Sequence, residues 1–159
     1  MILYRIARAR FNRPATAFSG EGASKFAHRW NHPSPEIRAV YCSDSLALAC
    51  LECIVHIRPL PRILPASVYY VVDVPDNLLE VVSRSALPAG WDSDVPGSAS
   101  QGYGMKFLTE QRAAGLVVPT AIQPVGRNAV LNALHPAFSL AWVQGPFPYK
   151  FNSRLGSLA

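Results

Sequence analysis

Short runs of hydrophobic residues cover much of the chain, and most have the length and spacing typical of strands. The clearest run, residues 68–74, is β-branched or aromatic throughout apart from Asp73, a composition that favours a strand. We expect six to eight short strands in all. The predicted strands cover residues 2–9, 25–31, 37–42, 68–74, 78–82, 116–123, 129–132 and 138–143.

Two stretches are predicted to be helices. The first, residues 45–57, follows Ser43 or Asp44 as the N-cap and stops before Pro59. Apolar side chains would cover this helix on all sides, so it should be buried over most of its surface. The second covers residues 105–114 and should end at Gly115.

Proline, glycine and serine separate these elements. They predict an irregular loop over residues 12–22, a turn over 32–35, a crossover over 58–66 and a long, mobile loop over 85–104. No segment repeats, and no shift in composition marks a second domain in the 159 residues, half of them hydrophobic. The pattern predicts one mixed α+β domain spanning residues 1–159.

Glu52 departs most sharply from the hydrophobic pattern, because residues 46–55 are otherwise only Leu, Ala, Cys, Ile and Val. An ionised carboxylate in such surroundings requires a cation or hydrogen-bond donors. An ion pair with Arg29 or another arginine would be a structural explanation, and a catalytic carboxylate is the alternative. Taken singly, Arg29 fits a surface charge, Tyr41 a core residue and Thr120 a strand residue.

The net charge of +5 is unevenly placed. Residues 1–38 hold seven basic and two acidic side chains, whereas residues 39–159 hold eight of each. A local positive field favours an anionic partner, which could be nucleic acid, a phosphorylated small molecule or an acidic protein.

Other features of the composition predict a soluble cytoplasmic protein. The apolar runs are far shorter than a membrane span, and the first ten residues lack the apolar core of a secretory signal. Three cysteines, Cys42, Cys50 and Cys53, lie in or beside the apolar stretch. An odd number in this setting favours reduced, packed thiols.

Several common kinds of active site are not predicted. On a helix His56 would lie about 120° around the axis from Cys50, so Cys50, Cys53 and His56 do not form a zinc clip. The chain lacks a Gly-x-Ser-x-Gly motif and closely spaced paired carboxylates, and Gly20-x-Gly22 fits neither a phosphate loop nor a dinucleotide fingerprint. A nucleophilic cysteine would need an accessible, electropositive setting.

A series of short motifs, in order along nearly the whole chain, resembles the RES-domain family of bacterial toxins. The block from Arg29-Trp30-Asn31 to Leu46-Ala47-Leu48 and Glu52 is the most specific part. The remaining matches are Tyr4-Arg5, residues 19–23, Val40-Tyr41 with Ser43, Val55-His56, residues 118–121, residues 128–132 with His135-Pro136, and Arg154-Leu155.

The resemblance implies an ADP-ribosyltransferase-like fold with a split sheet, and cleavage of the nicotinamide–ribose bond of NAD as substrate, with no cofactor and no metal. The family's arginine, tyrosine and glutamate fall on Arg29, Tyr41 and Glu52, which would be catalytic. Two positions differ from the usual pattern: Thr120 replaces a serine, and Ala27-His28 replaces Gly-Gly. The implied substrate-binding residues are Arg5, Arg29, Trp30, Tyr41 and Thr120.

This chemistry agrees with the lone acid. Breaking the bond develops positive charge on the ribose, which the Glu52 carboxylate would stabilise. Arg29, helped by Arg5 or another N-terminal arginine, would hold the pyrophosphate. Tyr41 would contact the nicotinamide–ribose end and Thr120 would supply a hydroxyl.

The resemblance also implies a partner, an Xre-type antitoxin that binds DNA and covers the NAD cleft, so that nucleic acid is involved only through the antitoxin. A homodimer within that complex is a further expectation. Two alternatives remain open: transfer of ADP-ribose to a protein, and a non-catalytic basic module that binds nucleic acid. The second would need exposed aromatic residues, whereas Tyr69 and Tyr70 lie in a strand that should be buried.

Overall fold

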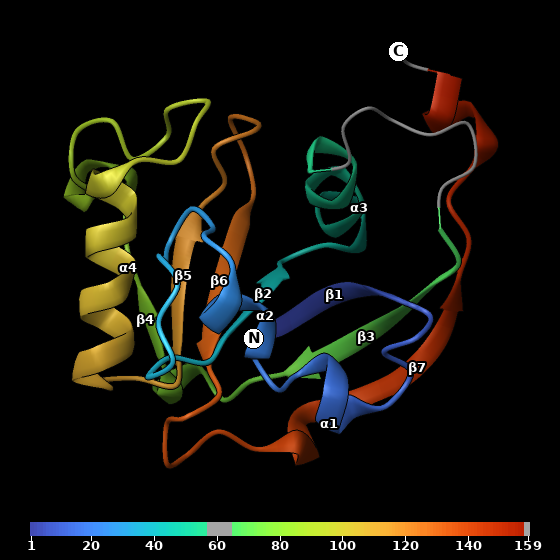
Figure 1. Ribbon diagram of the computed structural model, residues 1–159, viewed down its shortest axis with the longest axis horizontal. Helices are drawn as coiled ribbons and strands as arrows, with labels where there is room; N and C mark the ends of the chain where they lie inside the picture. The colour runs from blue at the N-terminus through green and yellow to red at the C-terminus, as the bar shows by residue number, and fades with distance from the viewer. Residues whose placement is uncertain (57–64, 158–159) are drawn as a thin grey trace.

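A seven-stranded mixed sheet forms the centre of the computed structural model, which describes residues 1–56 and 65–157 (Figure 1). The strand order is β4-β5-β6-β2-β1-β3-β7; β4 and β5 are parallel, and all other neighbours are antiparallel. This confirms the predicted α+β class. The strands are β1 (Ile2–Arg8), β2 (Ala39–Ser43), β3 (Ser67–Asp73), β4 (Leu79–Val81), β5 (Gly115–Pro119), β6 (Arg127–Asn132) and β7 (Val143–Tyr149).

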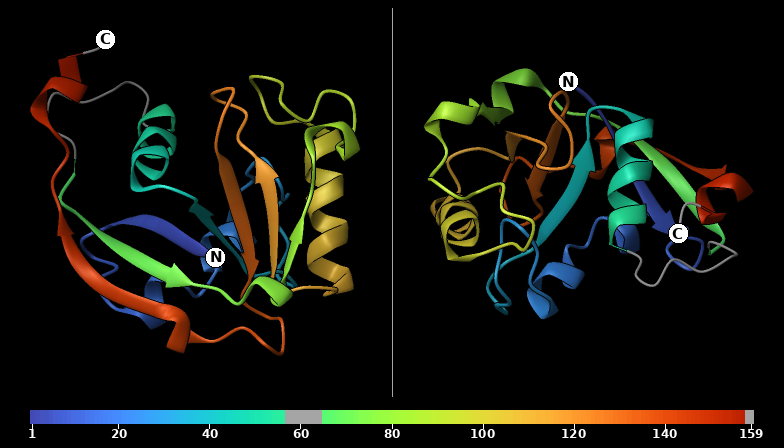
Figure 2. Two further views of the ribbon diagram at one scale, coloured as in Figure 1. Left: turned by 180° about the vertical axis from the view of Figure 1, so that it is seen from behind. Right: turned by 90° about the horizontal axis from the view of Figure 1, so that it is seen from above.

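The sheet is nearly split in its middle. β1 and β3 pair along seven residues, but β1 and β2 share a single registered pair, Tyr4 with Ser43. In consequence β4, β5, β6 and β2 form one part of the sheet, and β1, β3 and β7 form a second part whose strands cross the first at an angle (Figures 1 and 2). Helix α3 (Leu46–Val55) follows β2 and packs on β1 and β2, where the two parts diverge.

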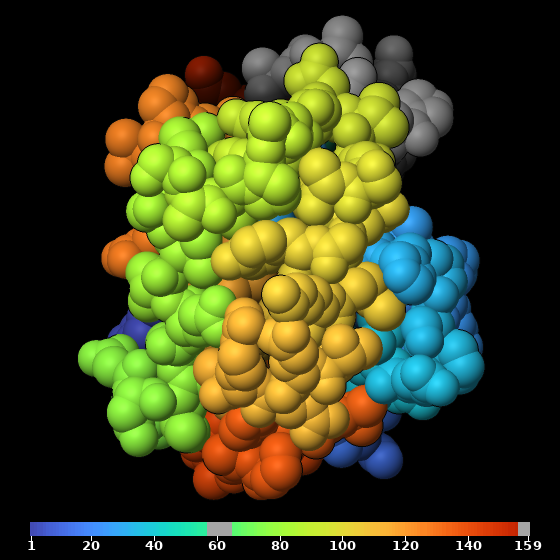
Figure 3. Space-filling view, turned by 90° about the vertical axis from the view of Figure 1, so that its left-hand side faces the viewer, coloured from blue at the N-terminus to red at the C-terminus, as the bar shows by residue number. Residues whose placement is uncertain are grey.

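Helix α4 (Ser98–Glu110) covers the β4-β5-β6 part of the sheet, with the loop before it at one end (Figure 3). Phe107 and Leu108 pack against Leu116 and Val130 in one hydrophobic cluster. A second cluster fills the centre of the sheet around Leu3, Val40, Val72 and Leu131. Tyr70 is fully buried there, as its strand pattern predicted, whereas Tyr69, for which burial was also predicted, is only partly buried.

Two short helices precede β2, where the sequence predicted first a loop and then a strand. α1 (Pro14–Ala17) and α2 (Glu21–Lys25) lie largely within the predicted loop. The strand prediction for residues 25–31 is wrong, because the chain forms a tight turn in which His28 and Asn31 pair backbone to backbone. Trp30 and Asn31 are buried at this turn by distant contacts that local alternation does not reveal.

Other elements differ from the predictions in their burial or in their ends. Helix α3 is not buried over most of its surface, because only Leu48 and Ala49 of its ten residues are buried. The N-cap of α3 is Ser45, whose hydroxyl accepts from the Leu48 amide, and neither Ser43 nor Asp44 has that role. Helix α4 begins at Ser98, inside the predicted loop, and ends at Glu110, so Gly115 opens β5 instead of ending a helix. Residues 140–142 form a 3₁₀ turn, and the strand there begins only at Val143. Residues 57–64, which include most of the predicted crossover, lie outside the described residues.

The structure also contains short 3₁₀ turns. η1 (Asp76–Leu78) lies between β3 and β4, η2 (Arg84–Ala86) between β4 and α4, and η3 (Leu140–Trp142) between β6 and β7, whereas η4 (Ser153–Ser157) follows β7. None of the helices that the structure describes combines the length and the apolar sequence required to cross a bilayer.

Candidate active site

A cleft of about 1600 Å³ opens where the sheet splits, beside α3. Five of the six predicted site residues line it: Arg5 on β1, Arg29 and Trp30 in the turn after α2, Tyr41 on β2, and Glu52 on α3. Thr120, the sixth, is fully buried and contacts Glu52. The fold therefore brings together residues from across the first three-quarters of the chain.

Glu52 is held by neutral donors. Thr120 Oγ1 donates to Glu52 Oε1 at 3.2 Å, and Asn128 Nδ2 donates to the same oxygen. His56 Nε2 lies 3.9 Å from the other oxygen, Oε2, which is longer than a hydrogen bond. Within residues 1–56 and 65–157 no arginine pairs with this carboxylate, whose side chain is 26% exposed. The structural explanation by an arginine ion pair therefore fails for this part of the chain.

Asn128 is a site residue that the sequence reasoning missed. It lies on β6 opposite Ser43, whose hydroxyl donates to Asn128 Oδ1 at 2.8 Å. Because that bond occupies the amide oxygen, the amide nitrogen is turned towards Glu52. Its place at the start of the matched motif 128–132 was the available signal.

Thr120 directly follows β5, which ends at Pro119, so the strand predicted over residues 116–123 stops before this residue. Its amide donates to the Gly126 carbonyl at 3.1 Å, and its hydroxyl accepts from the Ile122 amide at 3.3 Å. The hydroxyl is thereby fixed as a donor towards Glu52. The threonine thus supplies a positioned hydroxyl at the position where the resemblance implied a serine.

Arg29 is anchored to a loop. Its Nη1 donates to the carbonyls of Trp91 and Ser93 at 2.8 and 2.9 Å. The Nε and Nη2 donors make no hydrogen bond within the described part of the chain. The guanidinium is therefore held in place on one side, with donors remaining for a ligand.

Tyr41 is a neutral hydrogen-bond donor. Its hydroxyl donates to Asn31 Oδ1 at 2.7 Å, and burial raises its pKa well above the ordinary value. Asn31 is fully buried, and its amide nitrogen donates to the Ala23 and Phe26 carbonyls at 2.8 and 3.0 Å. Asn31 therefore couples the Arg29 turn to Tyr41, a role that the sequence did not predict.

His28 packs its ring against Tyr41, with the centroids 5.2 Å apart. Burial lowers its pKa, and the nearby charges of His56 and Arg5 lower it further. The imidazole is thus biased towards its neutral form, at a position where the resemblance implied glycine.

Arg5 lines the cleft and joins three elements, β1, β2 and α1. Its Nη1 donates to the Tyr41 carbonyl at 2.8 Å and its Nε to the Ala17 carbonyl at 3.0 Å. Burial raises the pKa of the Cys53 thiol to about 11, although the positive charge of Arg5 acts to lower it. The Cys53 thiolate is therefore scarce at neutral pH, which disfavours a cysteine nucleophile.

Trp30 lines the cleft but is almost completely buried, since only 2% of its surface is exposed. It stacks on Trp91 at a centroid distance of 5.9 Å. Its visible role is to pack the Arg29 turn against the loop that Arg29 holds.

Metal-binding side chains do not gather in the described residues: no three of His, Cys, Asp or Glu are placed to hold an ion. The three cysteines are all free; Cys42 is buried, and Cys50 and Cys53 are partly buried.

Comparison with known proteins identifies the family. A model of the RES domain matches residues 2–152. The Prs ADP-ribosylating toxin of Sphingobium sp. (strain YBL2) is 39% identical over 137 residues, which cover 84% of this chain and 83% of that protein. The toxin Res of Photorhabdus laumondii is 33% identical over 138 residues, 87% and 85% of the two chains. That of Yersinia enterocolitica is 31% identical over 157 residues, 98% and 99%.

The fold is also shared with a solved structure. A chain of the Mycobacterium tuberculosis MbcT–MbcA toxin-antitoxin complex superposes with a TM-score of 0.68 at 22% identity, covering 98% of this chain and 86% of that one. The family model, the similar toxins and the common fold agree over almost the entire length. The chain belongs to the RES-domain family.

Proposed function

We propose that this protein is the toxin of a toxin-antitoxin system and that it consumes NAD by hydrolysing the nicotinamide–ribose bond. The observation that carries the proposal is the Glu52 carboxylate, which lines a large cleft and is fixed by Thr120 and Asn128 without a paired arginine in the described residues. Its negative charge is held in position and is not neutralised there. Such a charge suits a reaction that develops positive charge on its substrate.

In the proposed reaction the ribose–nitrogen bond breaks and its electron pair leaves with nicotinamide, which becomes neutral. The ribose is then oxocarbenium-like, and Glu52 stabilises it through the oxygen that accepts no hydrogen bond from Thr120 or Asn128. Water adds to the ribose carbon and releases a proton, which yields ADP-ribose. Because both donors bind Oε1, they orient the carboxylate before the substrate arrives.

Arginines would bind the phosphates of NAD. Arg29 keeps its Nε and Nη2 donors while Nη1 is anchored to carbonyls, and a planar guanidinium suits two-point binding of phosphate oxygens. Arg5 adds positive charge to the same cleft. Tyr41, protonated and oriented by Asn31, would contact the nicotinamide–ribose end. Trp30 would support this wall mainly by packing.

Transfer of ADP-ribose to a protein is the second candidate function. It shares the bond cleavage and differs only in the nucleophile, which would be a side chain of the acceptor. The relative that favours it is the Prs ADP-ribosylating toxin, 39% identical to this chain. The arrangement around Glu52 serves either outcome.

An antitoxin of the Xre type would be the partner that restrains the enzyme. The fold shared with a chain of a toxin-antitoxin complex supports a partner of this class. The excess positive charge of residues 1–38, several of which line the cleft, suits an acidic segment inserted there.

Purified protein incubated with NAD labelled in its adenylate phosphate tests the proposal. We expect labelled ADP-ribose and an equal amount of nicotinamide. Label retained on a polypeptide would support transfer instead. If the folded protein leaves NAD intact, alone and with bacterial extract, the proposal is overturned.

A further inference from the structure

Arg84 lies outside the lining of the cleft but contacts residues on both of its sides, the Thr120 that binds Glu52 and the loop that anchors Arg29. It belongs to none of the motifs that carry the family resemblance. It opens the short turn η2 (Arg84–Ala86) after β4. Its Nη1 donates to Asp92 Oδ2 at 3.1 Å, and its Nη2 donates to the Thr120 carbonyl at 3.3 Å. The guanidinium also lies 4.9 Å from the centre of the Trp91 ring.

Through Thr120, Arg84 reaches the wall that carries Glu52. The Thr120 hydroxyl donates to Glu52, and its amide donates to Gly126. Arg84 takes the remaining backbone group of this buried residue, the carbonyl. The bond therefore helps to set the orientation of the residue that holds the carboxylate.

Through Trp91 and Asp92, Arg84 reaches the loop that carries the Arg29 anchor. Arg29 binds the carbonyls of Trp91 and Ser93, and Arg84 binds the Asp92 side chain between them. Two arginines thus hold three consecutive residues of this loop. A continuous series of contacts runs from Glu52 through Thr120 and Arg84 to the loop.

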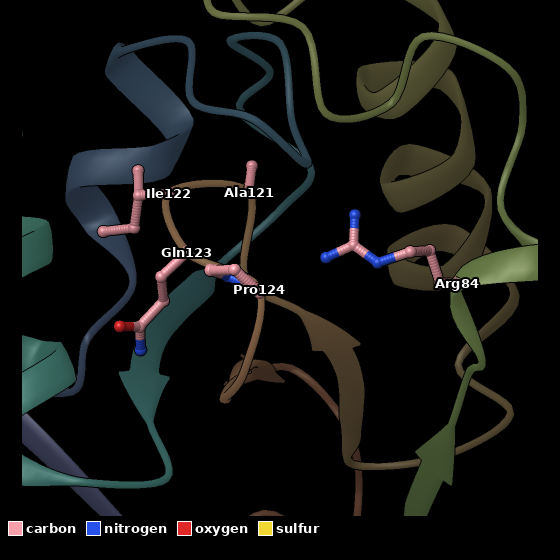
Figure 4. A pocket seen from close by; sticks show the side chains of 5 residues that line it. All are labelled: Arg84, Ala121, Ile122, Gln123 and Pro124. Atoms are coloured by element: carbon pink, nitrogen blue, oxygen red, sulfur yellow. The ribbon is translucent and has the colours of Figure 1, made fainter.

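The surroundings of Arg84 do not force this position. Its side chain is 48% exposed, and beside it lies a shallow depression of about 420 Å³ bounded by residues 121–124 (Figure 4). In Figure 4 the guanidinium extends across this space towards the Ala121–Pro124 loop. An exposed ion pair contributes little to folding, so a variant at Arg84 should fold. A lysine could keep the charge but not the fork that serves Asp92 and Thr120 together.

We propose that Arg84 is a positioning residue for the proposed NAD cleavage: it couples the Thr120–Glu52 pair to the loop anchored by Arg29. The inference rests on the proposed function. It assigns Arg84 no contact with the substrate, and its effect on turnover should pass through Thr120.

Steady-state NAD turnover by Arg84→Ala tests the inference. We expect kcat/KM to fall about tenfold, the equivalent of one hydrogen bond to a charged group, with most of the change in kcat. Arg84→Lys should lose most of the same factor. The matched control is Arg112→Ala, because Arg112 is 49% exposed and pairs with Glu80 and Glu110, outside the cleft lining. The control should retain wild-type turnover.

A double-mutant cycle separates positioning from a general structural role. Thr120→Val removes the hydroxyl that binds Glu52, so in that background Arg84→Ala should lower kcat by less than about twofold. If the losses of kcat in the two single variants multiply in full in the double variant, the inference is overturned. It is also overturned if Arg84→Ala or Arg84→Lys turns over NAD as fast as the Arg112→Ala control. A wild-type protein without NAD cleavage would instead overturn the proposed function, and this inference with it.

Discussion

The two walls of the cleft are built differently. Glu52 lies on the ten-residue helix α3, and its donors come from the end of β5 and from β6. Arg29 lies in a turn, and its anchors are carbonyls of a loop. Glu52 is therefore positioned by a helix and by residues on or next to strands of the sheet. Arg29 is positioned by contacts between a turn and a loop, neither of which is regular structure.

This difference suggests a division of labour. A carboxylate that must stabilise charge at one ribose carbon benefits from a rigid setting. A guanidinium that receives a flexible diphosphate can be placed on loops, where binding residues commonly lie. We therefore expect substitutions in the Glu52 wall to change mainly kcat, and substitutions in the Arg29 wall to change mainly KM or stability.

Glu52→Gln should have the largest effect. The amide keeps the shape and an oxygen for Thr120 and Asn128 but loses the negative charge, so kcat for NAD cleavage should fall about 100-fold or more, with KM changed little. Steady-state assays with nicotinamide release as the readout measure both constants. Glu80→Gln is the matched control, because Glu80 is 29% exposed and pairs with Arg112 away from the cleft. Undiminished kcat in folded Glu52→Gln would remove the carboxylate from the mechanism.

Arg29→Ala should raise KM about tenfold, because a charge-assisted contact to phosphate is lost, and it should lower kcat less. Titration of the Glu52→Gln protein and of the Glu52→Gln, Arg29→Ala double variant with NAD would show the same loss as weaker binding without turnover. If KM and NAD affinity stay at the wild-type values, Arg29 serves only to anchor the loop.

Gly104→Ala should destabilise the Arg29 wall. A Cβ at Gly104 would lie 2.6 Å from the Cβ of Trp30 and closer still to the Trp30 carbonyl oxygen. Overpacking of this kind lowers the free energy of unfolding by about 1–3 kcal/mol, against a gain of about 1 kcal/mol in helix propensity. Gly102→Ala, in the same helix but with no atom beyond the adjoining helix backbone within 4 Å of the added Cβ, should be neutral or stabilising. Urea unfolding of both variants measures the contrast, and equal stability would refute the close approach.

A change in pH should have the smallest effect. Burial and the charges of His56 and Arg5 lower the pKa of His28 in the folded protein, whereas in the unfolded chain it titrates near the ordinary value of about 6.5. Below that value the unfolded state binds the additional proton, so stability falls as the pH falls. The decrease in Tm between pH 7.5 and pH 5.5 should be smaller in His28→Gln than in the wild type. Equal decreases would contradict the lowered pKa.

The wall that the sequence described better is the one built from regular elements. The helix around Glu52 and the strand that carries Tyr41 follow from local hydrophobic patterns, and the lone acid stood out for the same reason. The strand at Asn128 was also predicted, but only from residue 129 onwards, so that Asn128 itself was left out. The turn at Arg29 and the start of α4 did not follow. Gly102 and Gly104 made residues 98–104 look like a loop, although Gly104 permits the helix to approach Trp30.

By itself the sequence determined the α+β class, the helix with its single carboxylate, and motifs specific enough to indicate the RES-domain family. Only the tertiary structure decided what holds each charge: Asn128 lies 76 residues from Glu52, and Trp91 lies 62 residues from Arg29. The physical reason is that local periodicity reports which face of an element is buried. The partner of a polar group is fixed by contacts between segments that fold together from distant parts of the chain.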